Sequence, residues 1–198
     1  MYKECEHLDL FPTPVSQYDL SFLDLDKISE IIEKVKVGPH GLLDDSDSSY
    51  GIEFTILYDE ELKFLKEELD NCIEEYTQRT GLQDINITGS WYNNMTTGRR
   101  LNLHRHEGSV LSGAFYLKVD NDSVPLRFKS PLLPYKMNDM YQRMDNQYAS
   151  PGVMLKPSKG QLILFPSWIE HETDSEQGHR CLISFNTFYN LLCFKFIH

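Results

Sequence analysis

The chain is poor in cysteine and has no long apolar run. Its four cysteines, Cys5, Cys72, Cys181 and Cys193, form no CxxC pair, so neither a disulfide framework nor a zinc knuckle is indicated. The longest apolar runs, such as 162–166, fall far short of the ~20 residues that a membrane helix needs. The N-terminal residues carry acids and no apolar signal core. We therefore expect a cytoplasmic protein with no membrane partner.

Positive charge is also scarce. The sequence holds 19 Lys and Arg against 30 Asp and Glu, a formal net charge of -11. Nucleic acids and anionic membranes both favour an excess of Lys and Arg, so we expect no nucleic acid among the partners. The hydrophobic content of 40% and charged content of 25% are those of a globular protein. At 198 residues the chain is long enough for one domain with a sizeable core.

The first half of the chain predicts two helices. Asp24 or Asp26 can cap the first, which ends before Gly38. The second runs from about residue 59 to residue 80 and ends at Gly81. Its apolar positions recur at helical spacing and are Leu62, Leu65, Leu69, Cys72, Ile73 and Tyr76. Between the helices, residues 43–50 are polar, and we expect an exposed, mobile loop there.

The second half predicts short strands separated by turn residues. We expect them near residues 86–95, 99–106, 110–119, 124–129, 151–155, 161–165, 179–190 and 192–197. This order predicts a mainly β fold with N-terminal helices, a jelly roll with the helices packed on one sheet. Residues 1–84 would form the helical region and 85–198 the β core of a single compact domain. Residues 131–150 interrupt the strands, as an irregular surface excursion or as a lid.

Three histidines and an arginine dominate the β half. His104 and His106 lie at i and i+2 and would face the same side of an extended segment. His171 follows 65 residues after His106, and Arg180 follows nine residues after His171. Three imidazoles can bind a metal from one side and leave its other coordination positions open. The guanidinium of an arginine has paired N–H groups suited to binding a carboxylate. The pattern is typical of an iron-dependent oxygenase with a carboxylate co-substrate.

The strand pattern around these residues indicates a cavity. On 99–106, Leu101 and Leu103 would face one side and His104 and His106 the other. Polar residues on an inner face need partners, which a bound carboxylate would supply to Arg180. An HxH pair alone is a weak signal, because surface histidines and an arginine in a salt bridge would give the same sequence pattern. We assign the remaining histidines, His7, His40, His179 and His198, to that surface class.

Ligand type does not select the metal, because imidazole suits Fe, Zn, Cu and Ni. Arg180 together with Tyr116 could anchor an oxo-acid on the metal, which favours iron. Zinc would need no such carboxylate pocket.

Two stretches, 98–117 and 160–186, make the chain similar to a known family over about a quarter of its length. They resemble the 2-oxoglutarate and Fe(II)-dependent oxygenase superfamily, in particular its prolyl-hydroxylase-like branch, and within it proteins of bacteria and marine phages. The resemblance implies a double-stranded β-helix with Fe(II) and 2-oxoglutarate as cofactors, and ascorbate as a further candidate. It implies O₂ and an unknown substrate, a peptide or a small molecule, as partners; a phage protein would act in the host cytoplasm.

The resemblance also implies roles for individual residues. His104 would be the first iron ligand and His171 the distal one. Arg180 would bind the far carboxylate of 2-oxoglutarate, with Tyr116 hydrogen-bonded to the same group and Ser184 as a further candidate.

One position departs from the family pattern. The family has Asp or Glu where this chain has His106, so we expect a three-histidine site. Glu107 could offer a carboxylate, but strand alternation would turn it away.

Three functions follow as hypotheses. The first is a 2-oxoglutarate-dependent dioxygenase that hydroxylates an unknown substrate, such as a protein side chain. The second is a three-histidine dioxygenase that does not use 2-oxoglutarate, similar in ligation to thiol dioxygenases, in which Arg180 would anchor the substrate itself. The third is a non-enzymatic jelly-roll binding module whose histidines are structural or bind zinc.

Overall fold

Two β-sheets and a layer of helices make up the fold in the computed structural model, which describes residues 4–6, 11–43, 46–132 and 150–190. The larger sheet contains Ser16–Asp19 (β1), Gly38–His40 (β2), Ser46–Ser48 (β3), Ile85–Met95 (β4), Leu111–Val119 (β5), Gln161–Pro166 (β8) and Arg180–Tyr189 (β10). The smaller sheet contains Leu126–Lys129 (β6), Gly152–Leu155 (β7) and His171–Thr173 (β9). The helices are Leu25–Ile32 (α1) and Lys63–Thr80 (α2), with short 3-10 turns at Gly41–Leu43, Ile56–Tyr58 and Glu60–Leu62.

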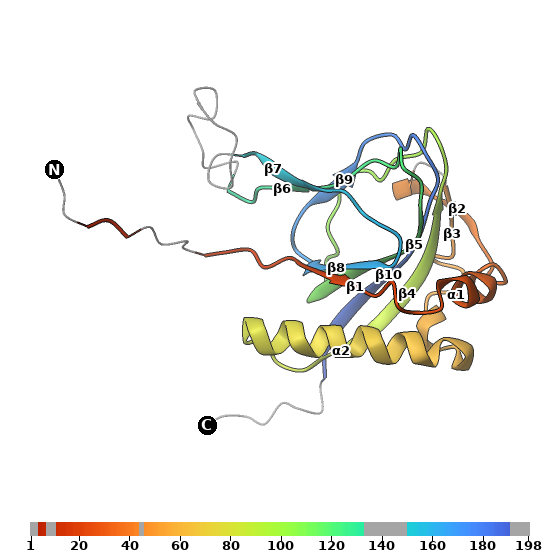
Figure 1. Ribbon diagram of the computed structural model, residues 1–198, viewed down its shortest axis with the longest axis horizontal. Helices are drawn as coiled ribbons and strands as arrows, with labels where there is room; N and C mark the ends of the chain where they lie inside the picture. Colours follow the sequence, from red (N-terminus) through yellow and green to blue (C-terminus); the bar gives the residue numbers. More distant parts are fainter. Residues whose placement is uncertain (1–3, 7–10, 44–45, 133–149, 191–198) are drawn as a thin grey trace.

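The order of strands is β1-β8-β5-β10-β4-β3-β2 in the larger sheet and β7-β6-β9 in the smaller one, and the strand pairs are antiparallel. The larger sheet lies between α2 and the smaller sheet (Figure 1). The predicted mainly β jelly roll with helices on one sheet is therefore confirmed. In the described part of the chain, no helix is both long enough and apolar enough to cross a membrane.

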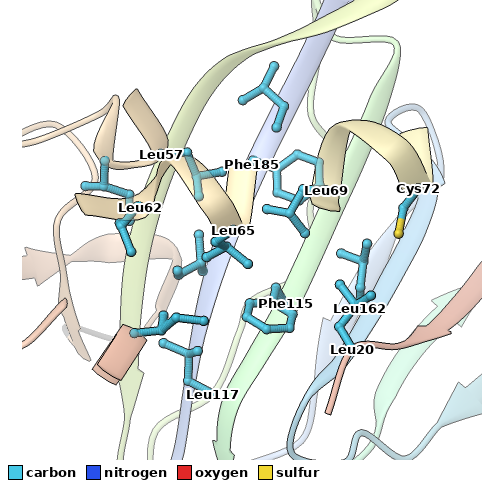
Figure 2. Close-up of a cluster of buried hydrophobic side chains, with 14 of the residues drawn as sticks. Leu20, Leu57, Leu62, Leu65, Leu69, Cys72, Phe115, Leu117, Leu162 and Phe185 are labelled. Atoms are coloured by element: carbon cyan, nitrogen blue, oxygen red, sulfur yellow. The ribbon is translucent and has the colours of Figure 1, made fainter. Parts of the chain in front are cut away.

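Helix α2 forms because its apolar residues recur on one face. Leu65 and Leu69 are fully buried there, and they point toward Phe115 and Phe185 of the sheet (Figure 2). The helix ends at Gly81, whose φ of 72° is left-handed and favours glycine. This face of α2 packs on the larger sheet, to which the N-terminal region also contributes β1, β2 and β3.

Helix α1 starts as the sequence predicts. The side chain of Asp24 accepts a hydrogen bond from the backbone N–H of Lys27 at 3.0 Å, which makes Asp24 the N-cap. The helix ends at Ile32, before Gly38.

The larger sheet is buried on both faces because its central strands alternate between two cores. On β5, Phe115 and Leu117 join the core beneath the helices. Tyr116 joins the second core, between the two sheets. On β10, Ile183 joins the core beneath the helices and Leu182 joins the core between the sheets. The inner face of β5 and β10 thereby lines the space between the sheets.

The strand predicted at 99–106 is wrong, because this segment pairs irregularly with β9. Thr173 N–H donates to Leu101 O at 3.0 Å, and the next bridge joins His104 to His171. Three steps along one segment therefore match two along the other, as in a β-bulge. The extra residue reverses the alternation: Leu101 lines the cavity beside the histidines, and Leu103 is exposed.

The exposed loop predicted at 43–50 is also wrong in part. Ser46–Ser48 forms β3, and Ser48 and Ser49 are buried. The hydroxyl of Ser48 donates to the side chain of Asn93 at 2.7 Å, and Ser49 N–H donates to Tyr92 O at 2.9 Å. A short polar strand such as β3 has no alternation of apolar residues to reveal it. The strand predicted at 192–197 and most of the predicted lid, residues 133–149, lie outside the described residues.

Candidate metal centre

His104, His106 and His171 lie together between the two sheets. One nitrogen of each ring lies within 4.8 Å of the others, and no other such group of His, Cys, Asp or Glu occurs among the described residues. The ring centroids of His104 and His171 are 4.3 Å apart, and those of His106 and His171 are 5.2 Å apart. Residues separated by 65 positions in the sequence thus form one cluster of nitrogen ligands.

Backbone pairing fixes this cluster. His171 opens β9 and pairs with Phe128 of β6. His104 and His171 exchange two backbone hydrogen bonds of 3.1 and 2.9 Å. His106 N–H donates to Ser167 O at 2.9 Å. The three rings are therefore carried by backbone segments bonded directly to one another.

Backbone carbonyls select the tautomer of two of the rings. The Nδ1 of His104 lies 2.8 Å from Asn102 O, and that of His171 lies 3.1 Å from Ile169 O. A carbonyl oxygen only accepts, so each Nδ1 carries the hydrogen and each Nε2 keeps a lone pair. Metal-binding histidines are commonly oriented by such a bond at the second nitrogen.

Burial keeps the three imidazoles neutral. It lowers the pKa of His104, lowers that of His106 to about 4, and lowers that of His171 well below its ordinary value. The neighbouring histidines add to the lowering of the pKa of His106 and His171, while a hydrogen bond to Asn186 opposes it at His106. Neutral imidazole is the form that binds a metal.

The donor set fits Fe(II). Imidazole nitrogen is a suitable ligand for this ion, and three donors leave coordination positions open. Glu107 does not join them, since its carboxylate is 2.7 Å from the guanidinium of Arg105 and its side chain is 75% exposed. His106 thus occupies the position at which the resemblance led us to expect an acid, and the three imidazoles together carry no negative charge.

A cavity of about 210 Å³ adjoins the cluster. The predicted residues that line it are His104, His106, Tyr116, His171, Arg180 and Ser184. The structure therefore brings every sequence-predicted site residue to one cavity.

Arg180 is buried at this cavity and is already held by the protein. Its Nη1 donates to Val124 O at 3.1 Å, and its Nη2 lies 3.2 Å from the sulfur of Met95. Its Nε is 3.2 Å from Oε2 of Glu176. Only 1% of Arg180 is exposed, so the guanidinium has a fixed orientation.

The two predicted helpers of Arg180 differ in their surroundings. Tyr116 is buried, which raises the pKa of its hydroxyl, and the charge of Arg180 opposes this rise. Its hydroxyl can therefore donate at neutral pH. Ser184 accepts a hydrogen bond from Asn93 Nδ2 at 2.9 Å, so its oxygen is engaged within the protein.

An aromatic wall, formed by His40, Tyr50 and Trp91, also lines the cavity and was missed from the sequence. Trp91 stacks on His106 with centroids 5.9 Å apart, and Tyr50 packs edge-on against both His40 and Trp91. The assignment of His40 to the surface histidines is therefore wrong. Alternation along 86–95 could have revealed Trp91, which shares a face of β4 with Asn93.

The other histidines lie elsewhere. His179 is outside the cavity, with Nε2 2.6 Å from Asn94 Oδ1 and Nδ1 2.7 Å from Lys118 Nζ. His7 and His198 lie outside the described residues.

Comparisons with known proteins point to one family. Residues 89–186 match a family described as "Putative 2OG-Fe(II) oxygenase". No curated protein sequence matches the chain. The expected likeness to phage proteins stays a prediction.

Solved structures share the fold. A prolyl-4-hydroxylase of Pseudomonas putida is 16% identical with a TM-score of 0.59, over 90% of this chain and 94% of that one. HygX from Streptomyces hygroscopicus, solved with nickel and 2-oxoglutarate, is 10% identical with a TM-score of 0.64, over 90% and 84%. A prolyl hydroxylase of Trichoplax adhaerens, solved with a peptide fragment of hypoxia inducible factor, is 14% identical with a TM-score of 0.61, over 88% and 83%.

The matched range, residues 89–186, contains His104, His106, His171 and Arg180. The neighbours have the same two-sheet architecture. The matched family and the fold therefore indicate an oxidoreductase similar to the 2-oxoglutarate and Fe(II)-dependent oxygenases, with Fe(II) and 2-oxoglutarate as its cofactors.

Proposed function

We propose that the protein hydroxylates a substrate in a cavity whose metal ligands are His104, His106 and His171. One observation carries this proposal: the three neutral imidazoles and the buried guanidinium of Arg180 line the same cavity. The metal ligands and the carboxylate anchor that 2-oxoglutarate needs are thus close together. The assignment of residues 85–198 as the catalytic core, with 1–84 supporting it, belongs to the same proposal.

Each residue has a distinct task. Bound iron with 2-oxoglutarate supplies the oxidative chemistry. The Nε2 atoms of His104 and His171 face the metal because their Nδ1 atoms are tied to the backbone. Arg180 and the hydroxyl of Tyr116 bind the far carboxylate of 2-oxoglutarate. The buried walls keep bulk water away from the reacting atoms.

The cavity limits how much substrate can enter. Its volume of about 210 Å³ is below the ~300–1,000 Å³ of pockets that enclose drug-sized ligands, and 2-oxoglutarate occupies part of it. We infer that the reacting group enters past the aromatic wall while the rest of the substrate stays outside. Tyr50 of the wall is 46% exposed and available for contact. This arrangement accommodates a protein side chain or one end of a small molecule.

The test is an anaerobic titration of metal-free protein with Fe(II) and then with 2-oxoglutarate, followed by the weak visible absorption band of the chelate. We expect the band in the native protein. Arg180→Ala should weaken 2-oxoglutarate binding without removing iron, because Arg180 is not a metal ligand. His104→Ala should lose both.

The matched control is His179→Ala, since His179 lies outside the cavity; it should behave like the native protein. Iron binding with no response to 2-oxoglutarate would overturn the proposal in favour of a three-histidine dioxygenase. A protein that is folded yet binds no iron would overturn it in favour of a binding module.

A further inference from the structure

Glu176 is a fully buried carboxylate that the proposed mechanism has not used. It lies between β9 and β10, with 0% of the residue exposed. A buried charge is costly unless hydrogen bonds and an opposite charge compensate it. Its partners therefore indicate what holds it there.

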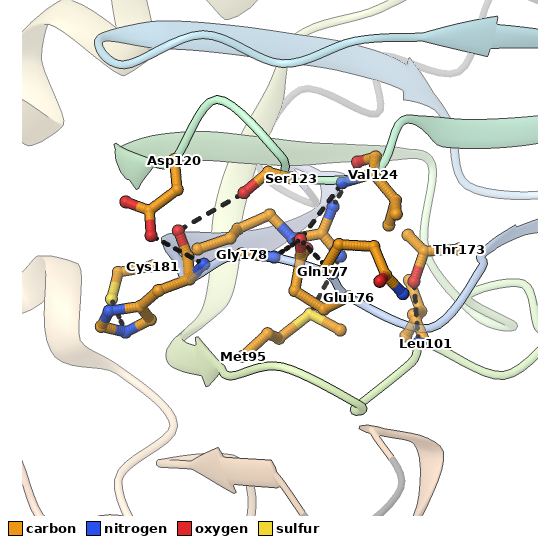
Figure 3. Close-up of polar contacts among 12 residues, drawn as sticks. Met95, Leu101, Asp120, Ser123, Val124, Thr173, Glu176, Gln177, Gly178 and Cys181 are labelled. Atoms are coloured by element: carbon orange, nitrogen blue, oxygen red, sulfur yellow. Dashed lines mark hydrogen bonds and ion pairs between the residues drawn. The ribbon is translucent and has the colours of Figure 1, made fainter.

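One oxygen of Glu176 organises the surrounding loops. Its Oε1 accepts hydrogen bonds from the backbone N–H groups of Val124, Gln177 and Gly178, each 3.1 Å long. Figure 3 shows these bonds converging on the carboxylate of Glu176. Gly178 lets its loop lie close to the turn at residues 120–123, since a Cβ there would lie 2.8 Å from the Cβ of Asp120. The backbone of Glu176 is itself bonded to residues 98 and 99.

The other oxygen faces Arg180. Oε2 lies 3.2 Å from Arg180 Nε, as an ion pair whose geometry is not that of a hydrogen bond. The two terminal nitrogens of Arg180 carry four N–H donors. Among the described residues, Val124 O and the sulfur of Met95 take one each, which leaves two. Two N–H donors are what a carboxylate needs for a bidentate contact.

We propose that Glu176 is the positioning residue of Arg180: it holds the Nε side of the guanidinium so that two outer N–H groups face a bound carboxylate. This inference rests on the proposed role of Arg180. The ion pair also leaves this part of the cavity without net charge before the ligand arrives. Arg180 then needs no reorientation when 2-oxoglutarate binds, which lowers the entropic cost of binding.

Glutamine at position 176 tests the idea because it keeps the shape and removes the charge. With its oxygen toward the three backbone N–H groups, its NH₂ meets the Nε–H of Arg180. With the amide reversed, its NH₂ meets the backbone donors. Either orientation places donors against donors. We expect Glu176→Gln to raise the Kd for 2-oxoglutarate about tenfold or more, with the Kd for Fe(II) unchanged.

The probe that separates positioning from general damage is pyruvate, a 2-oxo acid without the far carboxylate. Its binding to the Fe(II) protein should be the same in Glu176→Gln and in the native protein. Ser123→Ala is the matched control, since Ser123 lies buried in the adjoining turn and contacts His179 O rather than Glu176. It should leave both ligands unaffected.

A double-mutant cycle completes the test. Glu176→Gln combined with Arg180→Ala should bind 2-oxoglutarate no more weakly than Arg180→Ala alone, because the effect of Glu176 passes through Arg180. If Glu176→Gln does not fold, Glu176→Asp keeps the charge but withdraws it by one methylene, and the same loss confined to 2-oxoglutarate is expected.

Unchanged 2-oxoglutarate affinity, equal weakening of pyruvate, or additive effects of the two substitutions would each overturn the proposal. If Arg180→Ala itself leaves 2-oxoglutarate binding intact, the proposed role of Arg180 has failed instead.

Discussion

At the scale of single residues, the histidines of the cavity owe their protonation state to burial. The pKa of His106 falls to about 4 and that of His171 falls well below its ordinary value, with desolvation as the largest cause. The unfolded chain restores an ordinary histidine pKa of about 6.5. Folding and protonation of these side chains therefore oppose each other.

This opposition predicts how the metal-free protein responds to acid. Below about pH 6.5 the histidines of the unfolded chain bind protons, whereas the buried histidines of the folded protein stay neutral. The free energy of unfolding is therefore highest above that pH and declines as the pH falls toward about 4. We expect the Tm of the metal-free protein, measured by calorimetry, to drop between about pH 7.5 and about pH 5. His106→Gln cannot be protonated and should show a shallower drop; equal slopes would contradict this account.

At the scale of elements, helix α2 is the support of the larger sheet. Its buried face contacts the same core as Phe115 and Phe185 of the sheet (Figure 2). Phe115 is on β5 next to Tyr116, which faces the cavity. The packing of the helix and the position of a cavity residue are therefore coupled through one strand.

Substitution of Leu69 tests how much this packing contributes to the free energy of unfolding. It is 0% exposed, and removing a buried leucine side chain leaves a void that costs about 2–5 kcal/mol. We expect Leu69→Ala to lower the free energy of unfolding, measured with denaturant, by that amount. The control Asn71→Ala lies on the exposed side of the same helix and should change it by less than about 0.5 kcal/mol. Equal effects of the two substitutions would show that the helix does not support the sheet.

The glycine that ends α2 provides a second test of the element. Gly81 has a φ of 72°, and a Cβ there would meet no atom within 4 Å. Only backbone strain should therefore oppose a side chain. We expect Gly81→Ala to lower the free energy of unfolding by about 1 kcal/mol, and Gly81→Asn by less, since asparagine tolerates this conformation. Denaturant unfolding of the two variants checks the order, and the reverse order would contradict it.

At the scale of the whole molecule, the cavity ties the two sheets together. His171 belongs to the smaller sheet through β9, whereas Arg180 and Tyr116 belong to the larger one. His104 and His106 come from the segment that joins β4 to β5 and pairs with β9. A metal bound by the three histidines would cross-link β9 to the segment that joins β4 to β5.

This geometry predicts stabilisation of the folded protein by metal. A ligand at 100 times its Kd stabilises the folded state by about 2.7 kcal/mol, which raises Tm by roughly 5–10 °C for a chain of this size. We expect such a rise with Fe(II) under nitrogen, measured by differential scanning fluorimetry and reversed by a chelator. His104→Ala should abolish it, and an undiminished rise in that variant would place the metal elsewhere.

The sequence by itself determined those features that repeat locally. The spacing of apolar residues marks α2, and alternation marks β5 and β10, because side-chain direction follows directly from backbone period. The order of His104, His106, His171 and Arg180 indicated the chemistry, because these side chains are suited to few other tasks in combination.

Tertiary structure alone decided the remaining features. The bulge opposite β9 brought Leu101 into the cavity, and β2 and β3 brought His40 and Tyr50 to it. The contact of Glu176 with Arg180 also depends on how the loop folds against residues 98–99 and 120–124. A bulge reverses the alternation of side chains without changing composition, and strands as short as β2 and β3 show no alternation of apolar residues. Contacts between segments distant in sequence are set by packing, which no local pattern records.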